Sequence, residues 1–252
     1  MNGVLLSALL LGAAPISTEP RPPAASSSVS ALAPVPANAS TLAALLNPEQ
    51  GMVAVAVRVF ETGFHGAIEQ GAGGSEVFAE FPGLAEAIVE RCRPLVAKYT
   101  RDSVPAVQDK SARFFMSRFS PAEIDQLLLF YRSPVGTKVI AGMFAGVDGA
   151  DVAADIVDRE SGEVKSADIS KLVGSALMRI APSFTQDDKA ALIAFGTSPV
   201  GRKMNSLTPE IMAFNTQIAN EPDPELDAAL DKVIEEVTTD FITRHEATKR
   251  TG

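Results

Sequence analysis

The four-residue string Ser-Pro-Val-Gly occurs twice, and it constrains the fold more than any other feature of the chain. Ser198 lies 65 residues after Ser133, and this shift aligns eight identical residues in a gap-free stretch of twenty positions. An internal duplication explains such an alignment better than chance does. The identical pairs are Phe119/Phe184, Leu127/Leu192, Phe130/Phe195, Ser133/Ser198, Pro134/Pro199, Val135/Val200, Gly136/Gly201 and Lys138/Lys203.

The chemistry of the repeated string predicts a corner between two helices. Proline fits the first position of a helix, and the residue before it avoids helical geometry. We therefore expect Ser133 and Ser198 to cap helices that begin at Pro134 and Pro199. Gly136 and Gly201 leave room for a close helix contact. The helix before each corner has its own capping-box signature, Ser120 with Glu123 and Thr185 with Asp188.

Apolar residues at helical spacing occupy most of the remaining chain, so we predict an all-α protein. The expected fold is a multi-helix bundle of two similar helix–SPVG–helix repeats with additional N- and C-terminal helices. It covers residues 41–252, with repeat one at about 101–147, repeat two at about 166–212 and a C-terminal helix at about 224–246. Asn47 is expected to cap an early helix, and Pro94 predicts a kink or break.

The N-terminal segment predicts export. Residues 4–14 read VLLSALLLGAA, an apolar run of signal-peptide length that is too short to span a bilayer. No basic residue precedes it, which departs from the usual pattern. We expect a signal peptide at 1–25, a flexible linker rich in Pro, Ala and Ser at 26–40, and a periplasmic mature chain without a transmembrane helix.

Composition disfavours several classes of partner and cofactor. The formal net charge is −9, and an acidic surface repels nucleic acid. The chain has no Trp, one Cys and two His, which gives little material for sugar platforms or a zinc site. Cys92 reads as a buried small hydrophobe. We therefore expect no nucleic-acid partner, no cofactor and no metal.

No residue cluster forms a recognisable active site. Ser133 and Ser198 lack a neighbouring base in the sequence, and His65 and His245 belong to no motif. Lys138 and Lys203 lie near helix starts that can bind anions, but an exposed helix face is the simpler interpretation. A solvated face also explains the acidic series Asp148, Asp151, Asp155 and Asp158 better than calcium binding does.

The first copy resembles a known family. Phe119-Ser120-x-x-Glu123 is followed by Phe130, Tyr131, Arg132, Ser133, Pro134, Gly136 and Lys138 in the string FYRSPVGTK. This pattern resembles the signature of the bacterial domain-of-unknown-function family numbered twenty fifty-nine. The second copy departs from it at Gly196 and Thr197. The resemblance implies a mainly helical protein with an export signal, and it brings no catalytic residues.

These observations predict a non-enzymatic binding or interaction module of the bacterial cell envelope. A groove between the repeats is the expected binding place, for a protein partner or a small apolar ligand. Two alternatives stay open. One is an envelope hydrolase that uses His65 or paired carboxylates such as Glu86 and Glu90. The other is a structural module that self-associates.

Overall fold

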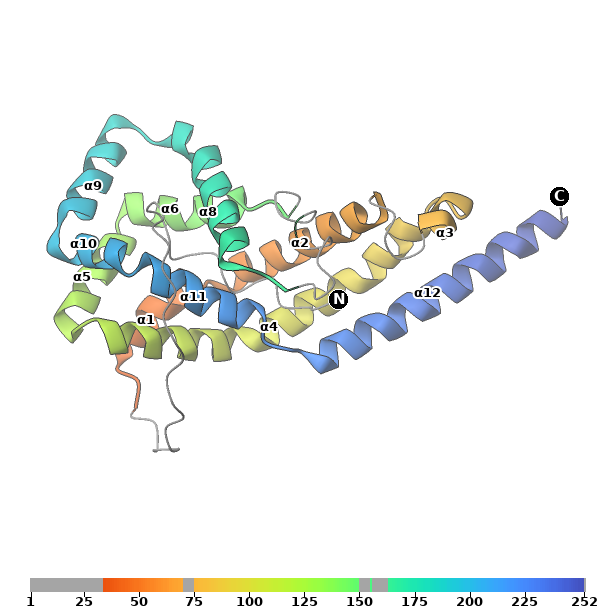
Figure 1. The fold of residues 1–252 in the computed structure, drawn as a ribbon, viewed down its shortest axis with the longest axis horizontal. Helices are drawn as coiled ribbons and strands as arrows, with labels where there is room; N and C mark the ends of the chain where they lie inside the picture. The colour runs from red at the N-terminus through yellow and green to blue at the C-terminus, as the bar shows by residue number, and fades with distance from the viewer. Residues whose placement is uncertain (1–33, 70–74, 150–154, 156–162, 252) are drawn as a thin grey trace.

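The computed structural model describes residues 34–69, 75–149, 155 and 163–251, and every regular element in these ranges is a helix (Figure 1). The predicted all-α class is confirmed. The elements are α1 (Ala37–Leu46), α2 (Glu49–Glu69), α3 (Ser75–Glu80), α4 (Leu84–Arg118), α5 (Pro121–Tyr131), α6 (Pro134–Gly146), α8 (Ser166–Ile180), the 3₁₀ turn η1 (Ala181–Ser183), α9 (Gln186–Thr197), α10 (Pro199–Ser206), α11 (Thr208–Ala219) and α12 (Pro224–Thr251).

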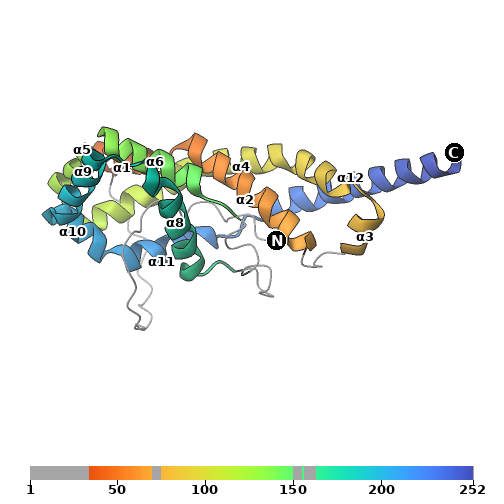
Figure 2. The same cartoon turned by 90° about the horizontal axis from the view of Figure 1, so that it is seen from above.

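The long helix α4 is the central element of the fold, against which α1, α2 and α12 pack. It runs along the long axis, and α2 and α12 pack beside it (Figures 1 and 2). Leu226 and Leu230 of α12 are buried, whereas the C-terminal end of α12 projects beyond the other helices. Its His245 lies edge-on to the ring of Phe81, with 5.3 Å between the ring centroids.

The helix α4 is continuous for 35 residues through Pro94 and Pro105, so of the kink or break predicted at Pro94 the break does not occur. A proline removes one backbone donor from the helix interior and disturbs a single turn. Here α1, α2 and α12 all pack against α4. Both prolines are exposed, so the carbonyls that lose their partners lie near water. Tertiary contacts therefore override the local preference.

The N-terminal helix α1 differs from expectation at two points. It begins at Ala37, inside the segment 26–40 predicted as a linker, and Ala39 in its first turn is fully buried. Its apolar side chains pack against α4 and α5, and this burial stabilises a helix that lacks a side-chain cap. Asn47 does not cap the next helix. Its side-chain nitrogen donates to Ala43 O at 2.9 Å and to Ser111 Oγ at 3.3 Å.

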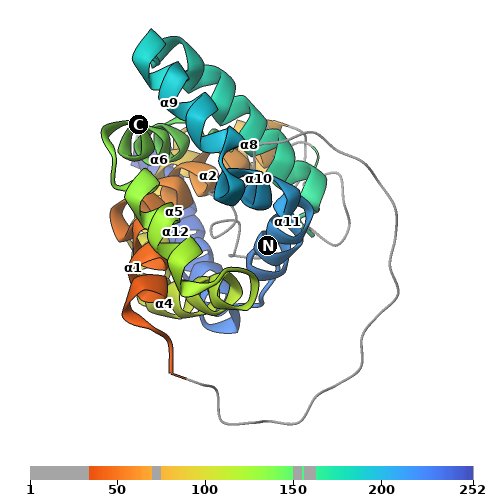
Figure 3. The ribbon, with the colours of Figure 1, turned by 90° about the vertical axis from the view of Figure 1, so that its left-hand side faces the viewer.

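The two copies pack so that the last helix of each contacts the first helix of the other. In copy one, the end of α4 leads into α5 and α6. In copy two, α8 leads into α9, α10 and α11. Helix α6 packs on α8, while α4 meets α11 through stacked Phe114 and Phe214 rings with centroids 4.7 Å apart. Viewed end-on, α5 lies beside α1 and α4, while α9 and α10 continue towards α11 (Figure 3).

The second copy is not an exact replica. Helix α6 is continuous, but its counterpart is divided into α10 and α11 at Leu207. Pro209 stands at the start of α11 and disfavours helical continuity through the residues before it. The burial of the first helix also differs. Helix α5 has four buried residues, whereas α9 has none.

Candidate functional site

The repeated serines cap helices, as their sequence context predicts. Ser133 Oγ accepts a hydrogen bond from Gly136 N at 3.2 Å, and Ser198 Oγ accepts from Gly201 N at 3.0 Å. Ser198 Oγ also donates to Phe195 O at 2.6 Å. Both hydroxyls therefore serve the local backbone, which explains them without a nucleophilic role.

The repeated glycines allow a close approach inside each corner. A Cβ atom built on Gly136 would collide with the backbone of Phe130 and Tyr131, chiefly with the Phe130 carbonyl oxygen. A Cβ atom on Gly201 would collide in the same way with the carbonyl oxygen of Phe195. The close neighbour is therefore the preceding helix of the same copy. These glycines fix the angle at which the two helices of a corner meet.

The repeated lysines join the two copies. Lys138 Nζ lies 2.8 Å from Asp188 Oδ2, and Lys203 Nζ lies 2.7 Å from Glu123 Oε2. Each lysine thus reaches the capping-box acid of the other copy. The expectation that both lysines serve an exposed helix face is wrong, because each is half-buried in an ion pair. Both lysine charges are thus already paired with carboxylates, which disfavours the binding of an anion by these two lysines.

The two capping-box acids are held in the charged form. Hydrogen bonding from Lys203, then from Ser120 N, lowers the pKa of Glu123 to about 2. Hydrogen bonding from Lys138, then from Thr185 N, lowers the pKa of Asp188 to about 2. A carboxylate that accepts bonds from a cation and a helix N-terminus favours its ionised form. Both acids therefore link helix capping to the contact between the copies.

Aromatic residues of the motif complete this contact. The rings of Phe130 and Phe195 stack face to face, with centroids 3.7 Å apart and an interplanar angle of 7°. Lys138 Nζ lies 5.3 Å from the centroid of the Phe184 ring, and Lys203 Nζ lies 5.0 Å from that of Phe119. These equivalent pairs give the interface an approximate two-fold symmetry. Arg132 is exposed and stands outside it.

An apolar cavity of about 300 Å³ lies between the copies. Its wall combines residues of both copies with Leu46 of α1, and none of the described residues that line it is charged. The lining residues are Leu46, Phe130, Tyr131, Val139, Ile140, Met143, Val173, Leu177, Phe184, Leu192, Phe195, Gly196, Met204, Asn205 and Thr208. The groove expected between the repeats therefore takes the form of this cavity, called the inter-copy cavity below.

The two copies differ at residues in and around this cavity. Tyr131 is buried in copy one, whereas its counterpart Gly196 lines the cavity with no atom within 4 Å of a built Cβ. Leu128 on α5 is 6% exposed, whereas its counterpart Ile193 on α9 is 66% exposed. Helix α1 packs against α5, while α9 makes its main contacts with α10 and α6. Copy two thus lacks the buried tyrosine side chain and the covering helix α1 that copy one has at the equivalent positions.

The duplicated region matches one family model in two separate segments. Residues 106–145 and 170–221 match the family described as uncharacterized protein conserved in bacteria (DUF2059). The predicted resemblance and the internal duplication are confirmed. The first DUF2059 segment spans the end of α4 through α6, and the second spans α8 through α11. The inter-copy cavity therefore lies between the two DUF2059 segments. No curated protein and no solved structure matches the chain.

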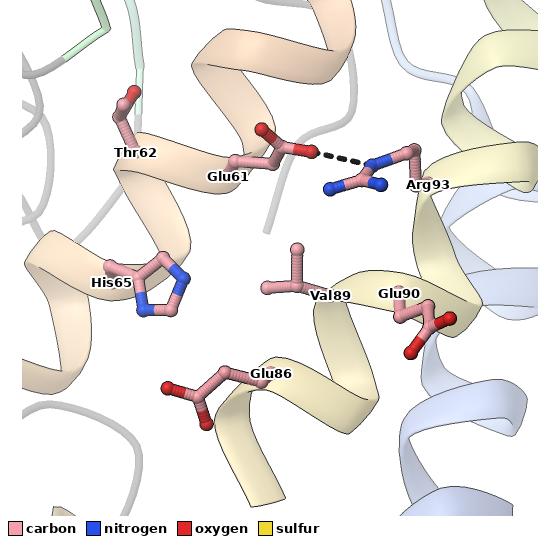
Figure 4. A pocket seen from close by; sticks show the side chains of 7 residues that line it. All are labelled: Glu61, Thr62, His65, Glu86, Val89, Glu90 and Arg93. Atoms are coloured by element: carbon pink, nitrogen blue, oxygen red, sulfur yellow. Dashed lines mark hydrogen bonds and ion pairs between the residues drawn. The ribbon is translucent and has the colours of Figure 1, made fainter. Parts of the chain in front are cut away.

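A second hollow, polar and open, lies outside the DUF2059 segments between α2 and α4 (Figure 4). Its volume is about 470 Å³, and Glu61, Thr62, His65, Glu86, Val89, Glu90 and Arg93 line it. Glu61 and Arg93 form an ion pair of 2.6 Å. The Glu86 carboxylate lies on the His65 side of the hollow, whereas that of Glu90 points away from His65 (Figure 4). The structure thus brings together three residues of the hydrolase alternative.

The chemistry of this polar hollow is limited. Thr62 Oγ1 donates to Arg58 O at 2.9 Å, so it is engaged with the backbone. Glu86, Glu90 and Arg93 are exposed to water, which screens their charges. Within the described ranges, no group of three or more His, Cys, Asp or Glu side chains is placed to hold a metal ion. His65 and Glu86, which lie on the same side of the hollow, are of residue types that act as general acids and bases.

The remaining candidates from the sequence lie apart from both hollows. Asp155 pairs with Lys171 at 2.8 Å, while Asp151 and Asp158 fall outside the described residues. The apolar run at residues 4–14 also falls outside them. None of the helices in the described part of the chain is long and apolar enough to cross a membrane. The sequence does not identify Gly196, Asn205 and Thr208 as cavity residues, although each differs in type from its counterpart in copy one.

Proposed function

We propose that the protein binds one small, uncharged and mainly apolar molecule in the inter-copy cavity. The observation that carries this proposal is a cavity wall built from both copies without a charged side chain. Binding sites for small molecules are concave, largely apolar and lined by a few polar groups. The cavity has that composition, with Tyr131, Asn205 and Thr208 as its polar members.

The size of the cavity favours a small molecule over a protein segment. An α-helix with its side chains is about 10 Å wide and rises about 1.5 Å per residue, so ten residues occupy roughly 1,000 Å³. The cavity offers about 300 Å³. A bicyclic aromatic molecule or a short branched hydrocarbon fits this space. Charged molecules are disfavoured, because burial of an unpaired charge is costly.

The experiment is a titration with N-phenyl-naphthylamine, an uncharged probe whose fluorescence rises in apolar surroundings. We expect saturable binding of one probe per chain. The variant Gly196→Tyr restores the side chain of copy one at a residue of the cavity wall, so it should weaken binding at least tenfold. Gly174→Tyr is the matched control, because Gly174 also has no atom within 4 Å of a built Cβ and does not line the cavity.

Two results would contradict the proposal. One is the absence of saturable binding to the wild-type protein. The other is equal affinity in the wild-type protein and in a folded Gly196→Tyr variant. Both substitutions replace a helical glycine, which lowers the cost of ordering the backbone, so both variants should fold. Circular dichroism and the thermal midpoint verify this before the titration.

We also propose that the protein works in the bacterial periplasm. The support is the apolar run at residues 4–14 and the Pro/Ala/Ser-rich stretch after it. A cleavage between residues 14 and 37 leaves α1 intact. Expression in a Gram-negative host, fractionation and N-terminal sequencing provide the test. Retention of the full N-terminus in the cytoplasmic fraction would overturn this part of the proposal.

The polar hollow favours a second candidate function, hydrolysis with His65 and Glu86. The supporting observation is that both residues line one open hollow. A panel of ester and amide substrates tests it with the variants His65→Ala and Glu86→Gln, and with Glu76→Gln on α3 as a control outside the hollow. Turnover that both hollow variants abolish would support catalysis, and its absence in the wild-type protein would exclude it for these substrates.

A further inference from the structure

Tyr131 is the buried member of the three polar residues that line the inter-copy cavity. Tyr131 lies at the end of α5 and is 9% exposed. It lines the cavity beside Phe130 and Phe195, whose ring centroids lie 5.1 and 6.1 Å from its own. The described residues offer no hydrogen-bond partner to its hydroxyl. A tyrosine hydroxyl that no protein group engages is free to bond to water or to a molecule that enters the cavity.

This hydroxyl is suited to donate a hydrogen bond. Burial raises the pKa of Tyr131 to about 12, so the phenol keeps its proton at neutral pH. A protonated phenol donates one hydrogen bond. The group that pairs with it is therefore an acceptor, such as a carbonyl, ester or ether oxygen. A carboxylate is excluded by the uncharged wall, because the cavity holds no cation to balance it.

The two sides of the cavity also differ in polarity. Ile140 and Met143 of α6 are buried apolar residues of the wall. Their counterparts in copy two are Asn205, which is exposed, and Thr208, which is half-buried. The apolar body of a ligand thus fits against α6 and α8, while the α10 side tolerates contact with water. This asymmetry indicates one preferred orientation for a bound molecule.

We propose that the cavity selects an uncharged molecule with an apolar body and a hydrogen-bond acceptor oxygen, which the Tyr131 hydroxyl binds. This inference rests on the proposed function, since it requires that the cavity is a binding site. It goes further by naming the recognising atom and the chemical class. Esters, ketones and ethers with roughly ten to fifteen non-hydrogen atoms suit a small cavity of this kind.

The experiment compares two ligands of nearly equal shape, acetylnaphthalene and ethylnaphthalene, substituted at the same ring carbon. Their affinities are measured by displacement of N-phenyl-naphthylamine from the wild-type protein and from Tyr131→Phe. We expect the ratio of the acetyl to the ethyl affinity to fall about three- to tenfold in Tyr131→Phe, as loss of one hydrogen bond predicts. The affinity for ethylnaphthalene should stay within about twofold.

Two controls separate a recognition role from a structural one. Tyr99→Phe changes the other tyrosine, which lies on α4 outside the cavity, and should leave the ratio unchanged. The thermal midpoint of ligand-free Tyr131→Phe should equal or exceed that of the wild-type protein, because the hydroxyl has no partner to lose. A lower midpoint would show that the hydroxyl bonds within the protein and would overturn the inference.

The outcomes distinguish the two proposals. If neither naphthalene nor the fluorescent probe binds the wild-type protein, the proposed function fails and this inference fails with it. If both ligands bind and Tyr131→Phe leaves their affinity ratio unchanged, the cavity remains a binding site and only the role of Tyr131 is overturned.

Discussion

At the scale of single residues, the sequence predicts correctly the roles that depend on near neighbours in the chain. Ser120 and Thr185 form the predicted capping boxes, because a cap depends on residues within one turn. Lys138 and Lys203 were misjudged, because their partners lie 50 and 80 residues away in the sequence. No local pattern reveals such a pairing. Asn47 illustrates the same limit, since its partner Ser111 comes from another helix.

The corner glycines give the first prediction. Gly136→Ala should lower the free energy of unfolding by about 2 kcal/mol, because the new methyl group must displace backbone atoms. Gly201→Ala should behave alike. Gly174→Ala is the control, which should raise stability by about 0.5 kcal/mol, since its Cβ meets open space. Urea unfolding measures all three. Equal stability of Gly136→Ala and Gly174→Ala would contradict the close contact.

Cys92 gives the second prediction. It is fully buried in α4, and desolvation raises its pKa to about 11. Only the thiolate reacts readily with Ellman's reagent, so the native thiol should react far more slowly than the thiol in unfolded protein. The reaction is followed at pH 8 with and without denaturant. Rapid native reaction would show that this part of α4 opens easily.

At the scale of elements, helix positions follow from periodicity, whereas their ends and continuity follow from packing. The apolar spacing that predicts α8 is local, and Ile169, Leu172 and Ala176 are all fully buried as it requires. The continuity of α4 through Pro94 is not local, because it depends on helices that pack from other parts of the chain. The start of α1 at Ala37 likewise depends on its burial against α4 and α5.

The capping boxes of α5 and α9 give the third prediction, a stability loss in acid. The pKa of Glu123 falls from 4.5 to about 2 on folding, and that of Asp188 falls from 3.8 to about 2. A group with a lowered pKa in the folded state contributes fully above its ordinary pKa and loses that contribution as the pH falls towards 2. Urea midpoints should therefore drop between about pH 5 and pH 2.

The variant Glu123→Gln with Asp188→Asn tests this cause. It should be less stable at neutral pH and should show a shallower fall in acid than the wild-type protein. Lys138→Met with Lys203→Met removes the main cause of both shifts, so both carboxyl pKa values should rise, which NMR titration measures directly. An unchanged acid profile in the first variant would assign the acid loss to other carboxylates.

At the scale of the whole molecule, the duplication was readable from sequence, but the arrangement of the copies was not. The alignment of Ser133 with Ser198 shows that a unit recurs, and it predicts a groove between the units. It does not show that α6 packs on α8 or that α11 packs on α4. The cavity wall contains both Tyr131 and its counterpart Gly196, a mismatch that the alignment shows without indicating where in the fold the two residues lie.

This packing of the two copies on each other gives the fourth prediction. A protein divided between residues 149 and 163 should yield two halves that copurify when expressed together, because α8, α11 and α12 of the second half contact α4 and α6 of the first. Each half alone should be largely unfolded, as it loses the partner for its apolar faces. Size exclusion and circular dichroism provide the readout. Independent folding of both halves would show that each copy is a domain by itself.

The exchange of lysine and acid between the copies has a consequence for how the chain can change over generations. Lys138 meets Asp188, and Lys203 meets Glu123, so each copy holds one half of two different bonds. A substitution that reverses the charge in one copy places like charges side by side in this contact, and a matching change in the other copy restores the pair. A change at any of these four positions therefore alters a bond to the other copy, whereas the difference between Tyr131 and Gly196 involves neither ion pair.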